Sequence, residues 1–371
     1  MPGQDFAYLS PMVFDYESRL RRLRESMRER GVGAVLLSVG PDLPYFSGYE
    51  AFPSERLTMA VVTESDAVLF LPRLEAPRVP DGPFEVRAWD ETEDPIRLVA
   101  GSVGRPETVA LGEQTWSVFT LALQDRIDVG WVSSGVLIRD LRMRKDEAEV
   151  QALATAAAQA DAVARRLPDE IRFAGSTEAA VAARIREMLV EEGHDQALFW
   201  IVASGPNGAS PHHEPSSRVI ERGDLVICDF GGSVHGYRSD TTRTFSVGEP
   251  IPRQAEVHQV VLSAQQAATA AVRPGVPCQE IDRVARAVIE DAGYGDYFIH
   301  RTGHGIGLDV HEDPYLVEGN DLPLEEGMAF SIEPGIYLPE EFGVRIEDIV
   351  VCGSDGPITL NDSPRELVVV E

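Results

Sequence analysis

Two pairs of strand-like segments, each with an acidic residue on both arms, restrict the fold of this chain more than any other feature. In the first pair, the apolar run Leu225–Cys228 leads into Asp229, and the β-prone run that follows contains Asp240. The glycine-rich connection between the runs is typical of an antiparallel hairpin. A turn centred between Val234 and His235 would place Asp229 opposite Asp240, with Cβ atoms ~4.5–5.5 Å apart.

The second pair repeats this arrangement about a hundred residues later. Glu333 ends one apolar run and Glu347 ends another, and a polar segment separates the runs. A turn centred on Glu340 would place Glu333 opposite Glu347. The dipeptide Pro334-Gly335 predicts a β-bulge next to the first acid, so the register is approximate here.

Acids that face each other on half-buried strands require a counter-charge, because burying a lone carboxylate costs several kcal/mol. A divalent cation supplies it. An all-oxygen ligand set favours manganese, magnesium or calcium, and one added imidazole shifts the preference toward manganese, cobalt, iron or zinc. His304, which lies between two glycines, is the candidate imidazole. Singly, such acids are commonly turn residues and such a histidine a loop residue, but together they suit two metals ~3.5–4 Å apart.

The rest of the chain indicates two domains, because 371 residues exceed one ordinary core. Short strand-like runs alternate with weakly helical stretches up to a boundary near residues 141–146. We therefore predict an α/β domain over 1–142. A domain of mixed helices and strands (α+β) follows over 143–371. It begins with an alanine-rich helix over 146–167 that Pro168 ends.

Charge and cysteine usage exclude several classes of protein. The net charge of −28 argues against nucleic-acid and anionic-membrane partners, which need clustered Lys and Arg. Three cysteines without a CxxC pair exclude a disulfide framework and a thiolate zinc site. The N-terminal sequence MPGQDFAYLSPMVFDY has no secretory pattern, and no apolar run approaches a membrane span. We expect a cytoplasmic protein.

The order of the candidate ligands resembles that of the pita-bread metallopeptidases, which comprise methionine aminopeptidase, Xaa-Pro aminopeptidase and Xaa-Pro dipeptidase (prolidase). The matching residues are Asp229 in CDFGG, Asp240 in SDTTR, His304 in TGHGIGLDVHE, Glu333 in IEPG and Glu347 in VRIED. Their spacing is similar to that of prolidases. The resemblance implies a creatinase/prolidase-like α/β domain over 1–142 and a pita-bread catalytic domain over 143–371. Methionine aminopeptidases generally lack the first of these.

The resemblance also implies two divalent metal ions per chain, most often Mn²⁺, with Co²⁺ or Zn²⁺ as alternatives. Asp229 would chelate one ion alone. His304 and Glu333 would hold the other, and Asp240 and Glu347 would bridge the two.

Further residues receive roles from the same resemblance. Glu333 would take a proton from the attacking water. His212 and His311 would contact the substrate and stabilise the tetrahedral intermediate. Arg345 would point into the site and offset its negative charge, with a solvent-exposed side chain as the alternative.

Three neighbouring residues receive predictions from strand alternation. Thr242 lies two residues beyond Asp240 and is expected to orient that carboxylate. Cys228 should face away from the metals as a packed core thiol. His213 is expected to be a surface loop histidine.

The implied reaction is hydrolysis of the Xaa-Pro bond in dipeptides. The alternative is an Xaa-Pro aminopeptidase that acts on longer peptides, because Tyr315 stands where some prolidases carry an arginine suited to the C-terminal carboxylate. A creatinase-like hydrolase and a non-enzymatic binding module compete less well, since both generally lack the full ligand set. The expected partner is a small peptide with proline at its second position, and a homodimer is expected. The native metal and the preferred residue before proline stay open.

Overall fold

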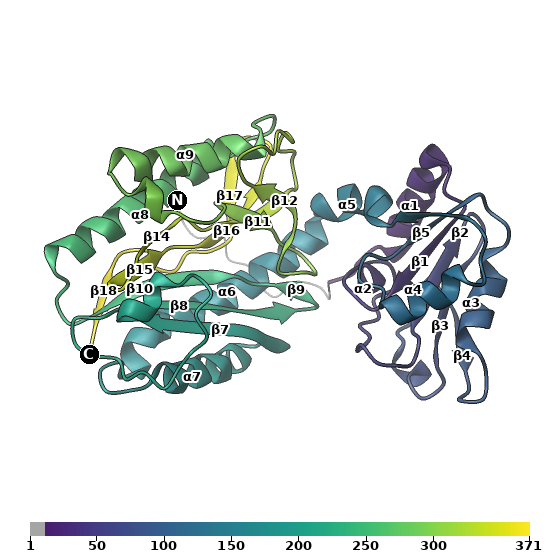
Figure 1. Ribbon diagram of the computed structural model, residues 1–371, viewed down its shortest axis with the longest axis horizontal. Coiled ribbons are helices and arrows are strands. Elements are labelled where there is room, and N and C mark those ends of the chain that lie inside the picture. The colour runs from purple at the N-terminus through teal and green to yellow at the C-terminus, as the bar shows by residue number, and fades with distance from the viewer. Residues whose placement is uncertain (1–11) are drawn as a thin grey trace. The chain divides into compact units, whose positions relative to one another are not determined.

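The computed structural model describes residues 12–371, which form two compact units, one ending at Arg142 and the other comprising Met143–Glu371 (Figure 1). The N-terminal segment in which the sequence shows no secretory pattern lies mostly outside the described residues. None of the helices within residues 12–371 combines the length and hydrophobicity needed to cross a lipid bilayer.

The first unit is built on a six-stranded sheet of order β4-β3-β2-β1-β5-β6. The neighbours of β2 are antiparallel to it, and the other pairs are parallel. Its strands are β1 (Ala34–Ser38), β2 (Met59–Thr63), β3 (Ala67–Pro72), β4 (Glu85–Trp89), β5 (Thr108–Leu111) and β6 (Gly130–Ser133). Its helices are α1 (Tyr16–Arg30), α2 (Asp42–Ser47), α3 (Pro95–Val103), α4 (Ser117–Gln124) and α5 (Gly135–Met143), the last of which continues into the second unit.

Local sequence explains where α1 begins and ends. The side chain of Asp15 accepts a hydrogen bond from the backbone N–H of Ser18, which caps the first turn. Gly31 adopts the left-handed conformation with φ of 66°, which ends the helix.

The second unit contains two five-stranded sheets and a separate two-stranded ribbon. The first sheet has the order β18-β10-β8-β7, with β9 paired to β8, and the second has the order β12-β11-β13-β16-β17. The strands are β7 (Gln196–Ser204), β8 (Leu225–Val234), β9 (Tyr237–Arg238), β10 (Thr241–Val247), β11 (Gly303–Gly305), β12 (Glu312–Leu316), β13 (Ala329–Ile332), β14 (Gly335–Leu338), β15 (Phe342–Arg345), β16 (Asp348–Cys352), β17 (Pro357–Thr359) and β18 (Val368–Val370).

Each of the two sheets packs on a pair of helices, as Figure 1 shows. The helices are α6 (Glu147–Glu170), α7 (Glu178–Glu191), α8 (Pro252–Ala271) and α9 (Cys278–Asp291). The first core joins α6 and α7 to β8 and β10, with Ile185 and Phe230 fully buried in it. The second core joins α8 and α9 to the other sheet, with Ile281 and Phe330 at its centre. The predicted end of the alanine-rich helix at Pro168 is wrong. Pro168 lies inside the last turn of α6, while Leu167 packs in the core.

The first acidic hairpin has a different register from the predicted one. Its turn consists of His235 and Gly236, with φ of 50° and 80°, as a two-residue turn requires. The predicted turn would have placed the β-branched Val234 at positive φ, which is unfavourable. Asp229 therefore pairs with Thr242, and not with Asp240. Because alternate residues share a face, Asp240 still lies on the same side as Asp229.

The second acidic hairpin has the predicted register on both sides of its acids. Gly335 pairs with Arg345 in the ribbon, and Ile332 pairs with Asp348 in the sheet, around a turn at Glu340 with φ of 64°. No residue is inserted at the predicted bulge. The ladder is interrupted there instead, and Glu333 lies at the break.

Within residues 12–371, one backbone bridge links the two hairpins, in addition to side-chain contacts between them. The backbone N–H of Glu347 donates to the carbonyl oxygen of Thr242 at 3.2 Å. This contact joins segments more than a hundred residues apart and brings their acids to one place.

Candidate metal centre

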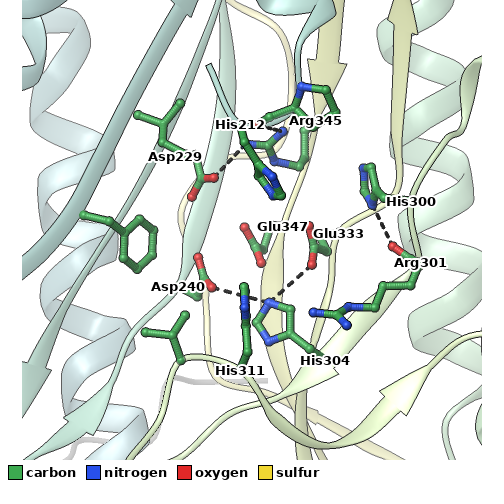
Figure 2. Close-up of a pocket in the computed structure, with 14 residues that line it drawn as sticks. His212, Asp229, Asp240, His300, Arg301, His304, His311, Glu333, Arg345 and Glu347 are labelled. Carbon is green, nitrogen blue, oxygen red and sulfur yellow. Dashed lines mark hydrogen bonds and ion pairs between the residues drawn. The ribbon is translucent and has the colours of Figure 1, made fainter. Parts of the chain in front are cut away.

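The acids of both hairpins face a pocket of about 620 Å³ in the second unit (Figure 2). The pocket brings together all eight residues singled out in the sequence, which are His212, Asp229, Asp240, His304, His311, Glu333, Arg345 and Glu347. They come from β8, β11, β15, the break in the second hairpin and several loops, so the tertiary structure assembles the site from distant parts of the chain.

The carboxylates and His304 are close enough to share a cation. His304 Nε2 lies 3.3 Å from Glu333 Oε1 and 3.6 Å from Asp240 Oδ2. Asp240, His304 and Glu347 each offer one ligand atom, and these atoms lie within 4.8 Å of one another. All three side chains are buried.

The backbone sets the orientation of the His304 ring. Its Nδ1 lies 3.1 Å from the carbonyl oxygen of Gly305. Because a carbonyl oxygen only accepts, Nδ1 carries the hydrogen and the lone pair of Nε2 points at the carboxylates. Burial lowers the pKa of His304, which favours the neutral ring that metals bind.

The electrostatics of the site call for added positive charge. Burial is the main cause of raised pKa values at three of the carboxylates. It raises the pKa of Asp240, that of Glu333 to about 7 and that of Glu347 to about 8, and repulsion from neighbouring carboxylates raises these pKa values further. In addition, the buried Oδ1 of Asp229 has no hydrogen-bond partner among the described residues. Oxygen ligands, one imidazole and an unsatisfied buried oxygen fit divalent cations of the manganese, cobalt or zinc type.

Arg345 lies inside the site, so the solvent-exposed alternative is wrong. Its side chain is 4% exposed, and its Nη2 donates to Asp229 Oδ2 at 2.6 Å. Its Nε donates to Thr242 Oγ1 at 3.2 Å, and its Nη1 donates to the Tyr337 hydroxyl at 2.9 Å. These contacts fix one oxygen of Asp229 and leave the other facing the pocket.

Two of the predictions for neighbouring residues are wrong. The hydroxyl of Thr242 donates to Glu347 Oε2 at 2.7 Å and not to Asp240, because the observed register moves Thr242 opposite Asp229. His213 is partly buried and binds Glu178 through Nε2 at 2.9 Å. The thiol of Cys228, in contrast, is buried in the core on the far face of β8, as predicted.

Glu178 anchors the loop that carries His212, and the sequence did not indicate this role. Its fully buried carboxylate accepts hydrogen bonds from backbone or side-chain groups of Ser204, Asn207, His213 and Ser216. Burial alone would raise the pKa of Glu178, but these bonds lower it to about 2. An acid in the first turn of a helix is ordinary, so only the fold reveals this network.

The two substrate histidines of the prediction both line the pocket beside the carboxylates (Figure 2). The rings of His311 and His304 have centroids 4.1 Å apart in an edge-to-face arrangement. Burial, followed by the nearby charges of His304 and Arg301, lowers the pKa of His311 to about 4. His311 is therefore neutral near pH 7 and able to donate one hydrogen bond.

Six further residues line the pocket without having been assigned a role from the sequence, and four of them bear on its chemistry. Phe199 and Ile201 form an apolar wall on β7, while His300 and Arg301 precede β11. The Arg301 guanidinium lies over the ring of Tyr315, 4.4 Å from its centroid. The only sequence signal that could have identified Arg301 was its position as a basic residue close to the Gly-His-Gly motif of an acidic chain.

Comparisons with known proteins agree with this geometry. The model of Metallopeptidase family M24 matches residues 151–354, and that of the Creatinase/Prolidase N-terminal domain matches residues 19–144.

Individual relatives match over nearly the full chain. The chain is 44% identical to the probable dipeptidase PepE of Mycobacterium tuberculosis (strain ATCC 25618 / H37Rv), with 96% of this chain and 98% of that protein covered. It is 36% identical to the Xaa-Pro dipeptidase of Lactobacillus delbrueckii subsp. lactis, with 95% and 98% covered. The crystal structure of recombinant prolidase from Thermococcus sibiricus matches with a TM-score of 0.92 and 37% identity, covering 96% of this chain and all of that one (100%).

Proposed function

Because the chain belongs to metallopeptidase family M24, we propose that it hydrolyses the Xaa-Pro bond of dipeptides with the help of two divalent metal ions. The resemblance found in the sequence is confirmed, as is the fold class of a creatinase/prolidase-like α/β domain followed by a pita-bread domain. The protein is a metallopeptidase. The observation that carries the proposal is the convergence of three buried carboxylates, one partly buried carboxylate and one histidine on a pocket with three further histidines.

In this proposal five side chains hold the metals. Asp229, Asp240, His304, Glu333 and Glu347 would hold the two ions. Bound divalent ions would polarise the scissile carbonyl and lower the pKa of a water molecule. Manganese is the proposed native metal because oxygen ligands with one imidazole suit it, with cobalt or zinc as alternatives.

The remaining catalytic residues accept a proton or donate a hydrogen bond at defined atoms. Glu333 accepts the proton of the attacking water at a carboxylate oxygen, and the hydroxyl of Ser331 helps to orient this carboxylate from 3.3 Å. His212 and His311 donate hydrogen bonds to the oxygen that gains negative charge as the carbonyl becomes tetrahedral. Arg345 keeps Asp229 in place through its 2.6 Å ion pair.

The pocket also offers a reason for proline as the second residue. An Xaa-Pro bond has no N–H, so a site that recognises proline needs a surface for the ring and not an acceptor for that hydrogen. Phe199 and Ile201 provide an apolar surface within the pocket. The free amino group of the substrate is attracted to the carboxylates of the pocket.

The proposal is tested by reconstituting the enzyme. Protein stripped with a chelator and reloaded with Mn²⁺ should cleave Xaa-Pro dipeptides, and the metal-free protein should not. Asp240→Asn should bind less metal by elemental analysis and lose at least about 100-fold in kcat/KM, whereas Glu290→Gln, an exposed change on α9, should do neither. Absence of metal-dependent cleavage of every Xaa-Pro peptide would refute the proposal.

The same assay separates the alternative. Cleavage of Xaa-Pro tripeptides but not of dipeptides would make the protein an Xaa-Pro aminopeptidase. We also propose a homodimer on the strength of the sequence resemblance, and light scattering after gel filtration tests it by the mass of the eluted protein.

A further inference from the structure

Lys145 carries a charge that is almost completely excluded from solvent. Its side chain is 1% exposed, and its Nζ donates to Glu312 Oε1 at 2.6 Å, where the Glu312 side chain is 10% exposed. The attraction within a buried ion pair is largely offset by the loss of hydration, and removing one partner leaves an uncompensated charge in the interior. Because such a pair adds little net stability, its main effect is to hold the two segments that carry it in one position.

The segment that carries Lys145 has a fixed backbone. Lys145 lies between α5 and α6, and its backbone N–H donates to the carbonyl oxygen of Gly327 at 2.8 Å. The next residue, Asp146, caps α6 by accepting a hydrogen bond from the backbone N–H of Glu149 at 2.9 Å. The ammonium group of Lys145 therefore extends from an ordered main chain.

The other partner, Glu312, directly follows His311, which lines the pocket. Glu312 begins β12 and pairs with Gly305 of β11, and residues 306–311 between them form the β11–β12 loop. A Cβ atom at Gly307 would lie 2.6 Å from Glu312 Oε1, so the carboxylate lies against the backbone of this loop. The ion pair thus acts on the end of the loop that carries His311.

A second set of contacts holds the β11–β12 loop from the first turn of α6. The hydroxyl of Tyr237 donates to Glu149 Oε1 at 3.0 Å, and both side chains are buried. The neighbouring Arg238 donates through its backbone N–H to the carbonyl oxygen of Gly307 at 2.9 Å, and through Nε to that of Leu308 at 3.2 Å. The beginning of α6 therefore holds the first residues of the loop, while the buried ion pair holds its last.

The position of His311 depends directly on Glu312, because the two residues share a peptide bond. Figure 2 shows the His311 ring beside that of His304, and the ring centroids are 4.1 Å apart. His304 has an anchor of its own, since its backbone N–H donates to Ser331 Oγ at 3.1 Å. A catalytic group that is displaced by ~1 Å can slow a reaction on the order of 100-fold. A shift of Glu312 should therefore affect His311 more than the metal ligand.

We propose that Lys145 is a positioning residue, whose buried ion pair with Glu312 holds His311 where it stabilises the transition state. The inference rests on the proposed function, since that function gives His311 its role. Lys145 acts through the backbone between Glu312 and His311, and it touches neither the substrate nor the metals.

The test measures Ala-Pro hydrolysis by Mn²⁺-loaded Lys145→Met, in which an apolar side chain of similar length replaces the cation. The kcat should fall about 10- to 100-fold, with KM within about threefold of wild type, because His311 acts on the transition state more than on the bound substrate. Elemental analysis should find the wild-type metal content, since the candidate ligands keep their positions. Lys145→Arg, which keeps a cation, should recover part of the lost kcat.

Arg144→Met is the matched control, because the neighbouring Arg144 forms an ion pair with Glu325 at 2.6 Å in which the side chains are 43% and 46% exposed. Its kcat should stay within about twofold of wild type. Hydrogen–deuterium exchange adds a readout that does not depend on activity. The backbone amide of Arg238, whose acceptor lies in the β11–β12 loop, should exchange about 10-fold faster in Lys145→Met and at the wild-type rate in Arg144→Met.

Each outcome supports or overturns the inference. A folded Lys145→Met enzyme with wild-type kcat, or with a loss confined to KM, would show that the ion pair is only structural and would overturn the inference. If Lys145→Met does not fold, Glu312→Gln decides, because it keeps the shape of the side chain and removes its charge. A severalfold lower kcat at unchanged KM in Glu312→Gln would support the inference, and a wild-type kcat would overturn it. All of these results leave the proposed function standing, whereas a wild-type enzyme without metal-dependent cleavage of Xaa-Pro peptides overturns both.

Discussion

Replacing Glu178 by glutamine should loosen the loop that carries His212 while leaving the metal ligands untouched. Glutamine has the shape of glutamate but only one acceptor oxygen. Both oxygens of Glu178 accept from a backbone N–H, one from Ser204 at 2.8 Å and the other from Ser216 at 3.1 Å. Whichever way the amide of glutamine turns, its NH₂ group meets one of these donors.

The lowered pKa of Glu178 sets the size of the expected loss of stability. The hydrogen bonds outweigh burial and lower the pKa from 4.5 to about 2, which corresponds to about 3 kcal/mol in favour of the charged, folded form. Because the folded-state pKa is the lower one, this stabilisation is present above about pH 4.5 and is lost as the pH falls toward 2. At pH 7 the full effect of the substitution should be visible.

Hydrogen–deuterium exchange measured by mass spectrometry reports the loss of these hydrogen bonds at individual backbone amides. In Glu178→Gln, the backbone amides of Ser204 and Ser216 should exchange up to about 100-fold faster, the factor that matches about 3 kcal/mol. Glu187→Gln provides the control, since Glu187 lies on the same helix in an exposed ion pair with Arg184.

Catalysis should follow the loop. With His212 less well held, kcat/KM for Ala-Pro should fall in Glu178→Gln, while the metal content stays at the wild-type level. Exchange at both serine amides within about threefold of wild type, together with unchanged kinetics, would refute the reasoning that this carboxylate positions the loop.

Two further changes test the rest of the site. Metal-stripped protein should lose thermal stability as the pH rises from 4.5 to about 8, because burial raises the pKa of Glu347 to about 8 and the folded state therefore holds a proton that the unfolded state has already released; added Mn²⁺ should abolish the fall in melting temperature, and identical pH profiles with and without metal would contradict this. Gly303→Ala would place a Cβ atom 1.9 Å from the carbonyl oxygen of Ser331 and should cost at least about 3 kcal/mol of stability together with metal binding. In Gly101→Ala, nothing lies within 4 Å of the new atom, so calorimetry should show equal or higher stability, and equal melting temperatures for both variants would argue against the clash.

Local patterns were sufficient for much of the fold. The alternation of short strand-like runs with weakly helical stretches predicted an α/β domain before the boundary, and α3 and β5 are part of that alternation. The register of the second acidic hairpin was also predictable, since its turn lies at Glu340 and its residues pair symmetrically about that position.

Other features depended on a balance between competing energies that cannot be read from the sequence. The first hairpin offered several glycines for its turn, and the cost of positive φ at Val234 decided among them. The helix α6 continued past its expected end at Pro168 because packing of Leu167 in the core outweighs one lost backbone hydrogen bond.

The sequence by itself determined which side chains can bind metal, because the acids at strand ends and the histidine between glycines have a chemistry that does not depend on the fold. Only the tertiary structure decided which contacts the residues around them make. It directed Thr242 to Glu347, buried Glu178 beneath the His212 loop and placed Arg301 over the ring of Tyr315. The physical reason is that hydrogen bonds and ion pairs depend on distances between segments that can lie more than a hundred residues apart in the sequence, and local patterns carry no information about those distances.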